Sequence, residues 1–350
     1  MSKERLQVPE SEQQVLWRVA EEQEHYTLVF GQAIEHFLDG MRDIERRIVN
    51  GGEDPDQIFE EVSGQIDGML RVCAQFEQET ADETIVKSTR SYFRKRTHAL
   101  LSKSYAVNRC RTWPQGHQGD FMTLETAYRE APLSDGIGYF LDKYVLNLPL
   151  AHGVRGRIEM LAELLRQELT ARKAPRVLDI ACGSCRELQD IVPEIRSSDA
   201  RFTCIDLDND ALNFAMDRLS HAELRPDQVT FINYNALRLF DHDIATAEFG
   251  LQDVIYSVGF FDYLPDDFLV RLLNALYGLL NQGGKLIMAF KDAGRYPSQA
   301  YHWLLDWDGF RQRRTADFER LLKQADIPAE ALTATRDRSG TILFYTAAKA

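Results

Sequence analysis

The 350-residue chain lacks the features that would assign it to several large classes of protein. It contains no apolar run of about 20 residues, the length that a membrane-spanning helix needs. Its N-terminus is polar from Ser2 to Gln14, unlike a signal peptide. With 41 basic against 54 acidic residues and a net charge of −13, it has no excess of the cations that bind nucleic acid. We therefore expect a cytoplasmic protein without integral membrane contact and without a nucleic-acid partner.

Cysteine is also scarce, and its five positions are too scattered for a disulfide framework. Cys182 and Cys185 form a C-x-x-C pair. A redox function would need thioredoxin-like surroundings, and a zinc site would need a second pair of ligands. The sequence offers neither, so we interpret both cysteines as small residues of a loop and predict no metal site.

Strand-like alternation is absent before about residue 170, and apolar residues recur there at helical spacing. Asn50-Gly51-Gly52 is typical of a helix end, and Asp54-Pro55 of a new start. The predicted helices cover residues 11–49, 55–76, 82–104, 120–130, 134–148 and 151–171. We expect an antiparallel helical bundle over residues 1–150, which caps the substrate, and a second domain over 151–350. A homodimer through the N-terminal helices is left open.

Acidic residues are missing altogether between Thr84 and Gly119, although the chain as a whole is acidic. This stretch carries Lys87, Arg90, Arg94, Lys95, Arg96, Lys103, Arg109 and Arg111. We favour pairing of these cations with the acidic first helices, or their solvation. The alternative hypothesis is an electrostatic funnel for an anionic substrate.

From Arg176 onward, short apolar strands alternate with helical segments, which predicts a parallel sheet covered by helices. The last two strands, residues 332–337 and 341–347, are joined only by Arg338-Ser339-Gly340 and therefore form a hairpin. The predicted fold class is α/β. It is a seven-stranded, mostly parallel Rossmann-like sheet with the last strand antiparallel, preceded by the helical region.

The residues at Val177–Leu188 form the most informative junction of the sequence. An apolar strand ends in an acid, and small residues then lead into a helix. Small side chains let the backbone approach a nucleotide-like ligand, and the helix N-terminus offers free N–H groups. A dinucleotide fingerprint would need glycine at position 186, where Arg186 stands.

This junction resembles the first motif of class I S-adenosylmethionine (SAM) methyltransferases. Asp179 is the acid, and Ala181, Gly183 and Cys185 stand where those enzymes most often have three glycines. Loops after the later strands and the Gly283-Gly284 step fit the same class. The resemblance implies SAM as cofactor and assigns its contacts to Asp179, Ala181, Cys182, Gly183, Asp206, Leu207, Asn235, Ala236, Ser257 and Gly259.

Two of these assignments have particular reasons. Asp206 ends the second strand, where a carboxylate can accept two hydrogen bonds from a ribose diol. Asp208 is the second candidate for that role, or else the N-cap of the next helix. Asn235 stands where the class often has an acid that holds the adenine amino group.

The helical region, the segment Trp113–Phe121 before Tyr128, and the Arg155-x-Arg157 pair together resemble a narrower bacterial group. This group includes methyltransferases for the biosynthesis of 3-hydroxypalmitic acid methyl ester, a diffusible cell–cell signal. The resemblance implies methylation of the carboxylate of a fatty acid or similar acid. A carboxylate is already nucleophilic at pH 7, so the enzyme has only to orient it and exclude water.

Arginine binds carboxylates through two parallel hydrogen bonds. Arg155 and Arg157 are therefore candidate catalytic residues, with Tyr128 or His117 as orienting groups; the same arginines could instead bind the SAM carboxylate. The insertion Asp292–Arg314 is rich in aromatic residues and fits a pocket wall or packing on the helical region. Candidate substrate contacts are Asp120, Phe260, Phe261, Tyr263, Tyr296, Trp303 and Arg311.

Two further functions stay open at this point. The first is methylation of a hydroxyl or amine of another small metabolite, which would need a general base such as His117 or Asp262. The second is a SAM-binding regulatory protein without turnover.

Overall fold

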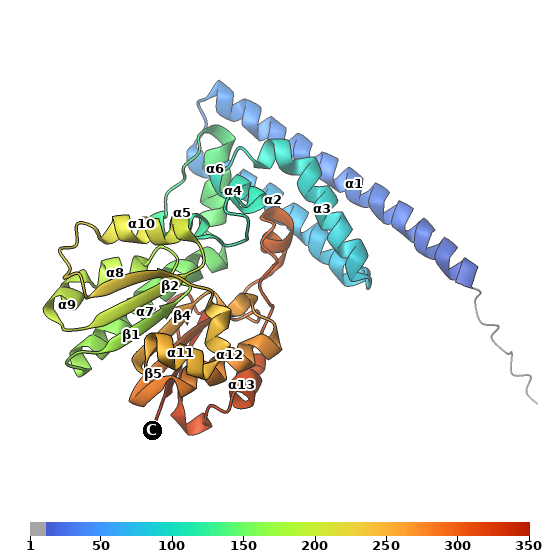
Figure 1. The fold of residues 1–350 in the computed structure, drawn as a ribbon. Helices are drawn as coiled ribbons and strands as arrows, with labels where there is room; N and C mark the ends of the chain where they lie inside the picture. The colour runs from blue at the N-terminus through green and yellow to red at the C-terminus, as the bar shows by residue number, and fades with distance from the viewer. Residues whose placement is uncertain (1–11) are drawn as a thin grey trace, which may run out of the picture.

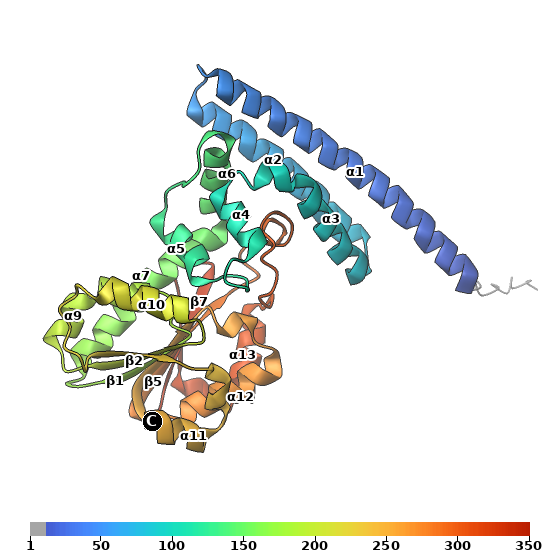
Figure 2. The same ribbon diagram turned by 45° about the horizontal axis from the view of Figure 1, so that its top comes forward.

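The computed structural model describes the backbone of residues 12–350 and the side chains of residues 29–350. Helices precede the first strand: α1 (Glu12–Asn50), α2 (Pro55–Glu79), α3 (Glu83–Leu101), α4 (Tyr105–Thr112), α5 (Phe121–Arg129), α6 (Gly136–Leu146) and α7 (Pro149–Ala171). Figures 1 and 2 show α2 and α3 beside α1, with α4 to α6 between them and the sheet. In the part that the structure describes, none of the helices is both long and apolar enough to span a bilayer.

Local sequence sets the helix boundaries much as the residue pattern predicts. The Asp54 side chain accepts a hydrogen bond from the Asp56 N–H, and Pro55 begins α2. Asp82 caps α3 in the same way through the Thr84 N–H. One difference is α4. The chain turns at Ser102–Ser104 and starts a separate short helix, because the Ser104 hydroxyl accepts the Val107 N–H.

Seven strands form one mixed sheet in the order β3-β2-β1-β4-β5-β7-β6. They are β1 (Arg176–Ile180), β2 (Arg201–Asp206), β3 (Val229–Asn233), β4 (Gln252–Val258), β5 (Leu280–Lys291), β6 (Leu332–Arg336) and β7 (Ile342–Ala348). Strands β1 to β5 are parallel, and β7 is antiparallel to both β5 and β6. The predicted fold class is therefore confirmed.

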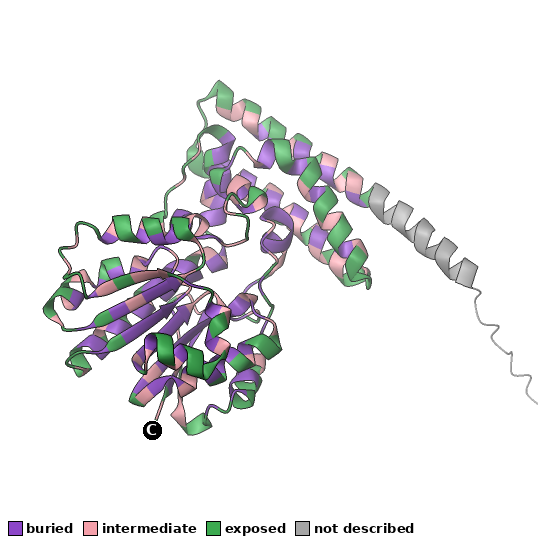
Figure 3. Cartoon of the chain, viewed as in Figure 1, coloured by how far each residue is buried: buried purple, intermediate pink, exposed green. Residues whose placement is uncertain are grey.

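Helices cover both faces of this sheet. One face packs α7, α8 (Arg186–Asp190), α9 (Val192–Ser197) and α10 (Asn209–Leu219). The other packs η1 (Ala236–Phe240), α11 (His242–Phe249), α12 (Asp266–Gly278) and α13 (Thr315–Gln324). Neighbouring residues of a strand serve opposite faces, as Val254 and Ile255 do. Figure 3 accordingly shows buried strands beneath helices whose outer sides are exposed.

The helical segment after β1 is divided in two. It breaks at Ile191 into α8 and α9, and Pro193 lies in the first turn of α9. Proline has no N–H to donate to the preceding turn, so the hydrogen-bond ladder of α8 cannot continue through it. The break places α8 as a single short turn directly after the loop at residues 181–185.

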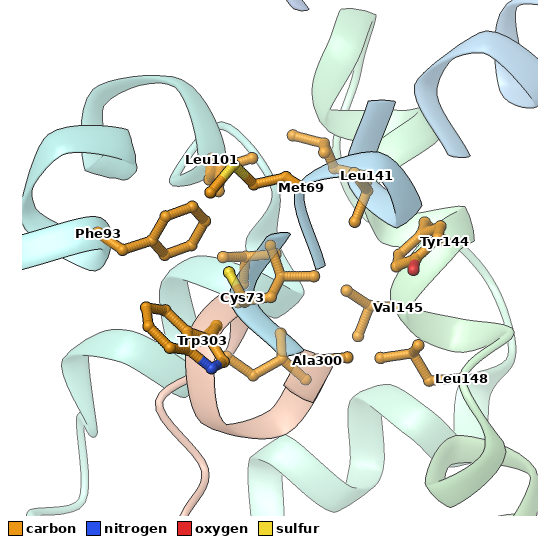
Figure 4. Close-up of a cluster of buried hydrophobic side chains, with 14 of the residues drawn as sticks. Met69, Cys73, Phe93, Leu101, Leu141, Tyr144, Val145, Leu148, Ala300 and Trp303 are labelled. Carbon is orange, nitrogen blue, oxygen red and sulfur yellow. The ribbon is translucent and has the colours of Figure 1, made fainter. Parts of the chain in front are cut away.

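The insertion, residues 292–314, leaves the end of β5 and packs into the helical region. Its π-helical turn η3 (Ala300–Leu304) carries Trp303, which is fully buried against Phe30, Phe76 and Phe93. Figure 4 shows this ring beside Phe93 and Ala300. The Trp303 indole N–H donates to Glu77 at 2.8 Å. We use the term helical half for α1–α6 with the insertion, and sheet half for α7 with the sheet and its other helices.

The basic stretch at 84–119 is largely paired with acidic side chains, as the favoured interpretation expects. Lys103 meets Glu45 of α1 at 2.6 Å, and Arg94 meets Asp306 of the insertion at 3.0 Å. The other pairs are Lys87 with Glu83, Arg90 with Glu77, Arg96 with Glu35, and Arg109 with Asp120. These cations thus join the helices to one another and to the insertion.

Candidate active site

The loop between β1 and α8 has an unusual backbone. Ala181, Gly183 and Cys185 all lie in the left-handed region, with φ of 56°, 55° and 47°. These are the three positions at which glycine was most expected, and a side chain there costs roughly 1 kcal/mol or more. The Cys185 N–H donates to the Cys182 carbonyl at 3.1 Å, which closes a tight turn. The loop therefore exposes backbone where a ligand can approach.

Asp206 and Asp208 have different roles at the end of β2. Asp206 Oδ2 accepts the Gly183 N–H at 2.8 Å, and its Oδ1 accepts the Asp208 N–H at 2.9 Å. Burial raises the pKa of the Asp206 carboxyl. Asp208 instead caps α10 through the Asp210 N–H at 2.8 Å. Asp206 is thus the acid that faces the loop, and each of its oxygens retains a lone pair for a ligand hydroxyl. Leu207, between the two acids, is 66% exposed.

The loops after β3 and β4 complete this edge of the sheet. Asn235 is exposed, and its Oδ1 accepts the Leu237 N–H at 3.0 Å as the cap of η1, while Ala236 is buried. The fully buried Ser257 hydroxyl donates to the Ile180 carbonyl at 2.8 Å and so ties β4 to β1. Gly259 has a φ of 104°.

Asp179 lies below the loop in a buried polar cluster. Asp179 was named from the sequence, but its neighbours Glu187 and Tyr256 were not. Burial, followed by the nearby Glu187, raises the pKa of the Asp179 carboxyl well above its usual range. The Tyr256 hydroxyl donates to Glu187 at 2.9 Å. A carboxylate oxygen of Asp179 and the sulfur atoms of Cys182 and Cys185 lie within 4.8 Å of one another. Burial raises the pKa of the Cys185 thiol. The carboxyls of Asp179 and Glu187 can therefore share a proton inside the fold.

Arg157 lies beside the loop after β4, on the side where a methyl acceptor would bind. This residue of α7 is only 2% exposed, and a Cβ on Gly259 would lie 2.9 Å from its guanidinium. It lies within hydrogen-bonding reach of Tyr128, whose pKa is raised by burial and lowered in part by this neighbour. Among the described residues, Arg157 forms no ion pair, and its buried Nε has no hydrogen-bond partner. A buried cation in this condition favours an anionic ligand.

A second buried cation, Lys291, was not anticipated from the sequence. Its ammonium lies 2.7 Å from Asp262 Oδ2, and both residues are 2% exposed or less. The rings of Tyr263 and Phe310 lie 5.3 and 4.8 Å from the same nitrogen. Burial lowers the pKa of Lys291, the Asp262 charge opposes this, and Arg157 adds to it. Lys291 is thus paired with Asp262, and the charge of the unpaired Arg157 also acts on it.

A small apolar chamber of about 40 Å³ adjoins this group between α4–α7 and the insertion. Its wall includes Ala127, Leu146, Val154, Tyr301 and Trp307. The Trp307 indole N–H donates to the Tyr263 hydroxyl at 2.6 Å. Trp307 therefore connects the chamber with the residues around Lys291.

Several other candidate residues lie elsewhere or are engaged by the protein itself. The Arg155 guanidinium donates to the carbonyls of Ala127 at 3.2 Å and Leu146 at 3.0 Å, and so fastens α5 and α6 to α7. His117 and Arg311 are exposed. Asp120 is buried, pairs with Arg109 at 2.7 Å and caps α5.

The aromatic candidates divide between core and chamber. Phe261 is fully buried in the core under the sheet, and Phe260 and Tyr263 are half-buried. Tyr296 and Trp303 belong to the core of the helical half. Of the predicted substrate contacts, Tyr263 is the one that the structure brings beside both Lys291 and the chamber wall.

Comparison with known proteins agrees with this geometry. Residues 178–286 match the family described as "Methyltransferase domain". A solved structure of a possible exported protein from Bordetella parapertussis is 18% identical, with 91% of this chain and 96% of that chain covered and a TM-score of 0.52. At that identity the likeness shows the fold alone, but it extends over the helical half as well as the sheet half.

Two further solved structures match a smaller share of the chain, with lower TM-scores. Magnesium protoporphyrin IX methyltransferase from Synechocystis with bound SAH is 16% identical, covers 65% of this chain and 95% of its own, and has a TM-score of 0.44. N-methyltransferase NodS from Bradyrhizobium japonicum with SAH is 20% identical, covers 65% and 97%, and has a TM-score of 0.39. The comparison with curated proteins found no match.

Residues 178–286 thus match a methyltransferase domain, and the sheet has the mixed seven-stranded arrangement that was predicted for a SAM-dependent methyltransferase.

Proposed function

We propose that this methyltransferase esterifies the carboxylate of a small molecule with an apolar tail, such as a 3-hydroxy fatty acid or a similar acid. The observation that carries the proposal is Arg157, a buried guanidinium without an ion pair among the described residues, set beside the loop after β4. A carboxylate bound there would neutralise a charge that is otherwise costly to bury.

The proposed cofactor contacts follow from the loops at the sheet edge. Asp206 would accept the ribose hydroxyls, the left-handed loop at 181–185 would hold the methionine portion, and Asn235 with Ala236 would border the adenine. No atom lies closer than 3.9 Å to a Cβ placed on Gly183, so the loop leaves room at this point. When bound, SAM supplies the electrophilic methyl group.

The protein's own part in the reaction would be orientation and exclusion of water. A carboxylate with a usual pKa near 4 is ionised at pH 7 and needs no general base. The fork of Arg157 would hold one or both carboxylate oxygens, and Tyr128 would restrict the position of that fork. The apolar chamber beyond Trp307 has room for the first carbons of the tail, and its wall would contact them.

Methylation of a hydroxyl or amine would need a free base near the methyl group. Of the two candidates, His117 is exposed, and both oxygens of Asp262 are engaged by Lys291, one by its ammonium and one by its backbone N–H at 3.1 Å. The geometry therefore favours a carboxylate as acceptor.

The test combines product chemistry with one variant. Methyl-labelled SAM is incubated with acids of varied chain length; volatile, base-labile label is expected from an ester, and stable label would contradict the proposal. Arg157→Leu should lower turnover by about 100-fold, since charge-assisted hydrogen bonds worth about 3 kcal/mol are lost. SAM affinity, measured by calorimetry, should change by less than about threefold.

Arg311→Leu is the matched control, because Arg311 is exposed. It should leave turnover and SAM affinity as they are. If SAM affinity falls in parallel with turnover in Arg157→Leu, the guanidinium binds the cofactor carboxylate, and the assignment of the acceptor is wrong.

A further inference from the structure

Helix α5 crosses from the cofactor loop to the acceptor chamber, and its first turn lies against the loop. A Cβ on Gly183 would lie 3.9 Å from the Phe121 Cβ, and the Phe121 ring packs on Phe214 of α10 with centroids 5.3 Å apart. Although α5 belongs to the helical half, it therefore covers part of the sheet half.

Glu125, in the middle of α5, is joined to the loop by a buried network. Its exposed fraction is 2%, and its Oε1 accepts the Ser184 hydroxyl at 2.6 Å. Its Oε2 lies 2.6 Å from Arg218 of α10, and Arg218 also donates to the Ser184 carbonyl at 3.1 Å. The three residues thus connect α5, the cofactor loop and α10 by charge-assisted hydrogen bonds, which are the stronger kind.

The second half of the same helix forms part of the acceptor side. Thr126 and Ala127 line the apolar chamber. Tyr128 lies within hydrogen-bonding reach of Arg157, and the Ala127 carbonyl accepts from Arg155. With only nine residues, α5 is a short rigid element, so a shift at Glu125 moves the chamber wall as well.

We propose that Glu125 is a positioning residue that couples occupancy of the cofactor loop to the order of α5 and hence to the acceptor chamber. The loop at 181–185 needs left-handed residues at three alternate positions, and a bound cofactor would stabilise that backbone. Ser184 would then be fixed, and Glu125 with it. Because coupling between sites is reciprocal, an ordered α5 must in turn strengthen cofactor binding.

This inference goes beyond the proposed function, because it involves the cofactor loop and α5 for any acceptor. It predicts that a bound cofactor makes the chamber wall supplied by α5 more ordered. Coupling of this kind typically changes affinity by about 5- to 100-fold.

The experiment measures amide hydrogen exchange of the full-length protein with and without saturating SAH, the demethylated cofactor. In the unsubstituted protein, SAH should slow exchange in residues 121–129 as well as in the loop. The double variant Glu125→Leu/Arg218→Leu removes both charges together, so that neither remains buried alone. With SAH bound it should lose the slowed exchange in α5 and keep it in the loop.

Two controls separate positioning from stability. Arg129→Gln alters an exposed residue in the last turn of the same helix and should behave as the unsubstituted protein. Ser184→Ala keeps the Glu125–Arg218 pair; it should bind SAH and show weaker slowing in α5, and it decides the matter if the double variant does not fold. The inference is overturned if SAH leaves exchange in α5 unchanged in the unsubstituted protein. It is also overturned if the double variant or Ser184→Ala, when saturated with SAH, retains the full slowing of amide exchange in α5.

Discussion

The edge of the sheet after β2 and the contacts between the helices and the insertion use their charged groups differently. In the sheet half, the acids after β2 accept nearby backbone N–H groups, as Asp206 and Asp208 do. In the helical half, charges pair across elements, as Arg94 does with Asp306 and Lys103 with Glu45. The first arrangement shapes a ligand site from local chain geometry. The second joins helices and insertion into one body, so we expect substitutions in the two halves to affect different properties.

The largest effect that would sharpen this division is expected at the cofactor loop. Asp206→Ala removes the acceptor for the Gly183 N–H together with the proposed ribose contact. Two hydrogen bonds to a charged group are lost, so SAH affinity should fall by about 100-fold or more in calorimetry. Asp208→Ala, which removes only the cap of α10, should leave the affinity within about threefold. Equal losses in both variants would contradict the separate roles of the two acids.

The second effect concerns stability of the helical half. Trp303→Ala empties the site where the insertion packs on Phe30, Phe76 and Phe93, and leaves Glu77 without the indole donor. Removal of a buried tryptophan costs about 4 kcal/mol of unfolding free energy, measurable in urea. SAH affinity of the folded fraction should be unchanged.

Trp113→Ala is the matched control, since that ring is 36% exposed, and it should cost less than about 1 kcal/mol. If Trp303→Ala abolishes SAH binding at a temperature where the protein is still folded, the two halves are not separable in this way.

The contrast between local contacts and contacts across distant elements explains which parts of the fold and site follow from the sequence. The parallel sheet follows from alternating strands and helices, and the hairpin from Arg338-Ser339-Gly340, because these are local patterns. Asp206 could be named because it ends a strand. Its geometry agrees with that expectation, while its contact with the cofactor stays a prediction.

Residues whose importance depends on distant partners could not be found in this way. Lys291 follows an ordinary apolar strand, and only the fold brings Asp262 beside it. In the sequence, nothing distinguishes Glu125 of the short helix α5 from the chain's other acids. Only the fold brings Ser184 and Arg218 beside it. Arg155 and Arg157 are two residues apart, yet one is held by backbone carbonyls and the other lacks an ion pair among the described residues.

A third test uses pH to examine the join between insertion and helices. The pKa of His302 is lowered to about 4, chiefly by burial and also by Arg90 and Arg94, while Glu77 and Asp308 oppose the shift. Between pH 6.5 and 4 the unfolded chain therefore binds a proton that the folded chain does not, so stability is full above pH 6.5 and falls toward pH 4. The loss is at most about 3 kcal/mol.

His302→Gln removes this titration, so its unfolding free energy should fall less between pH 7 and pH 4.5 than that of the unsubstituted protein. His36 is exposed, and His36→Gln should follow the unsubstituted protein. Identical pH dependence in all three would show that His302 is not buried in the way described.

The smallest effect is expected where the helical half faces solvent. Arg96 is 47% exposed and pairs with an equally exposed Glu35, so its charge is screened by salt. Arg96→Glu should leave the KM for the acceptor within about twofold at physiological ionic strength. An electrostatic funnel would instead raise KM severalfold, and more strongly at low salt. A salt-dependent rise would give the helical half a role in attracting the acceptor, and would weaken the division between a half that binds ligands and a half that holds the protein together.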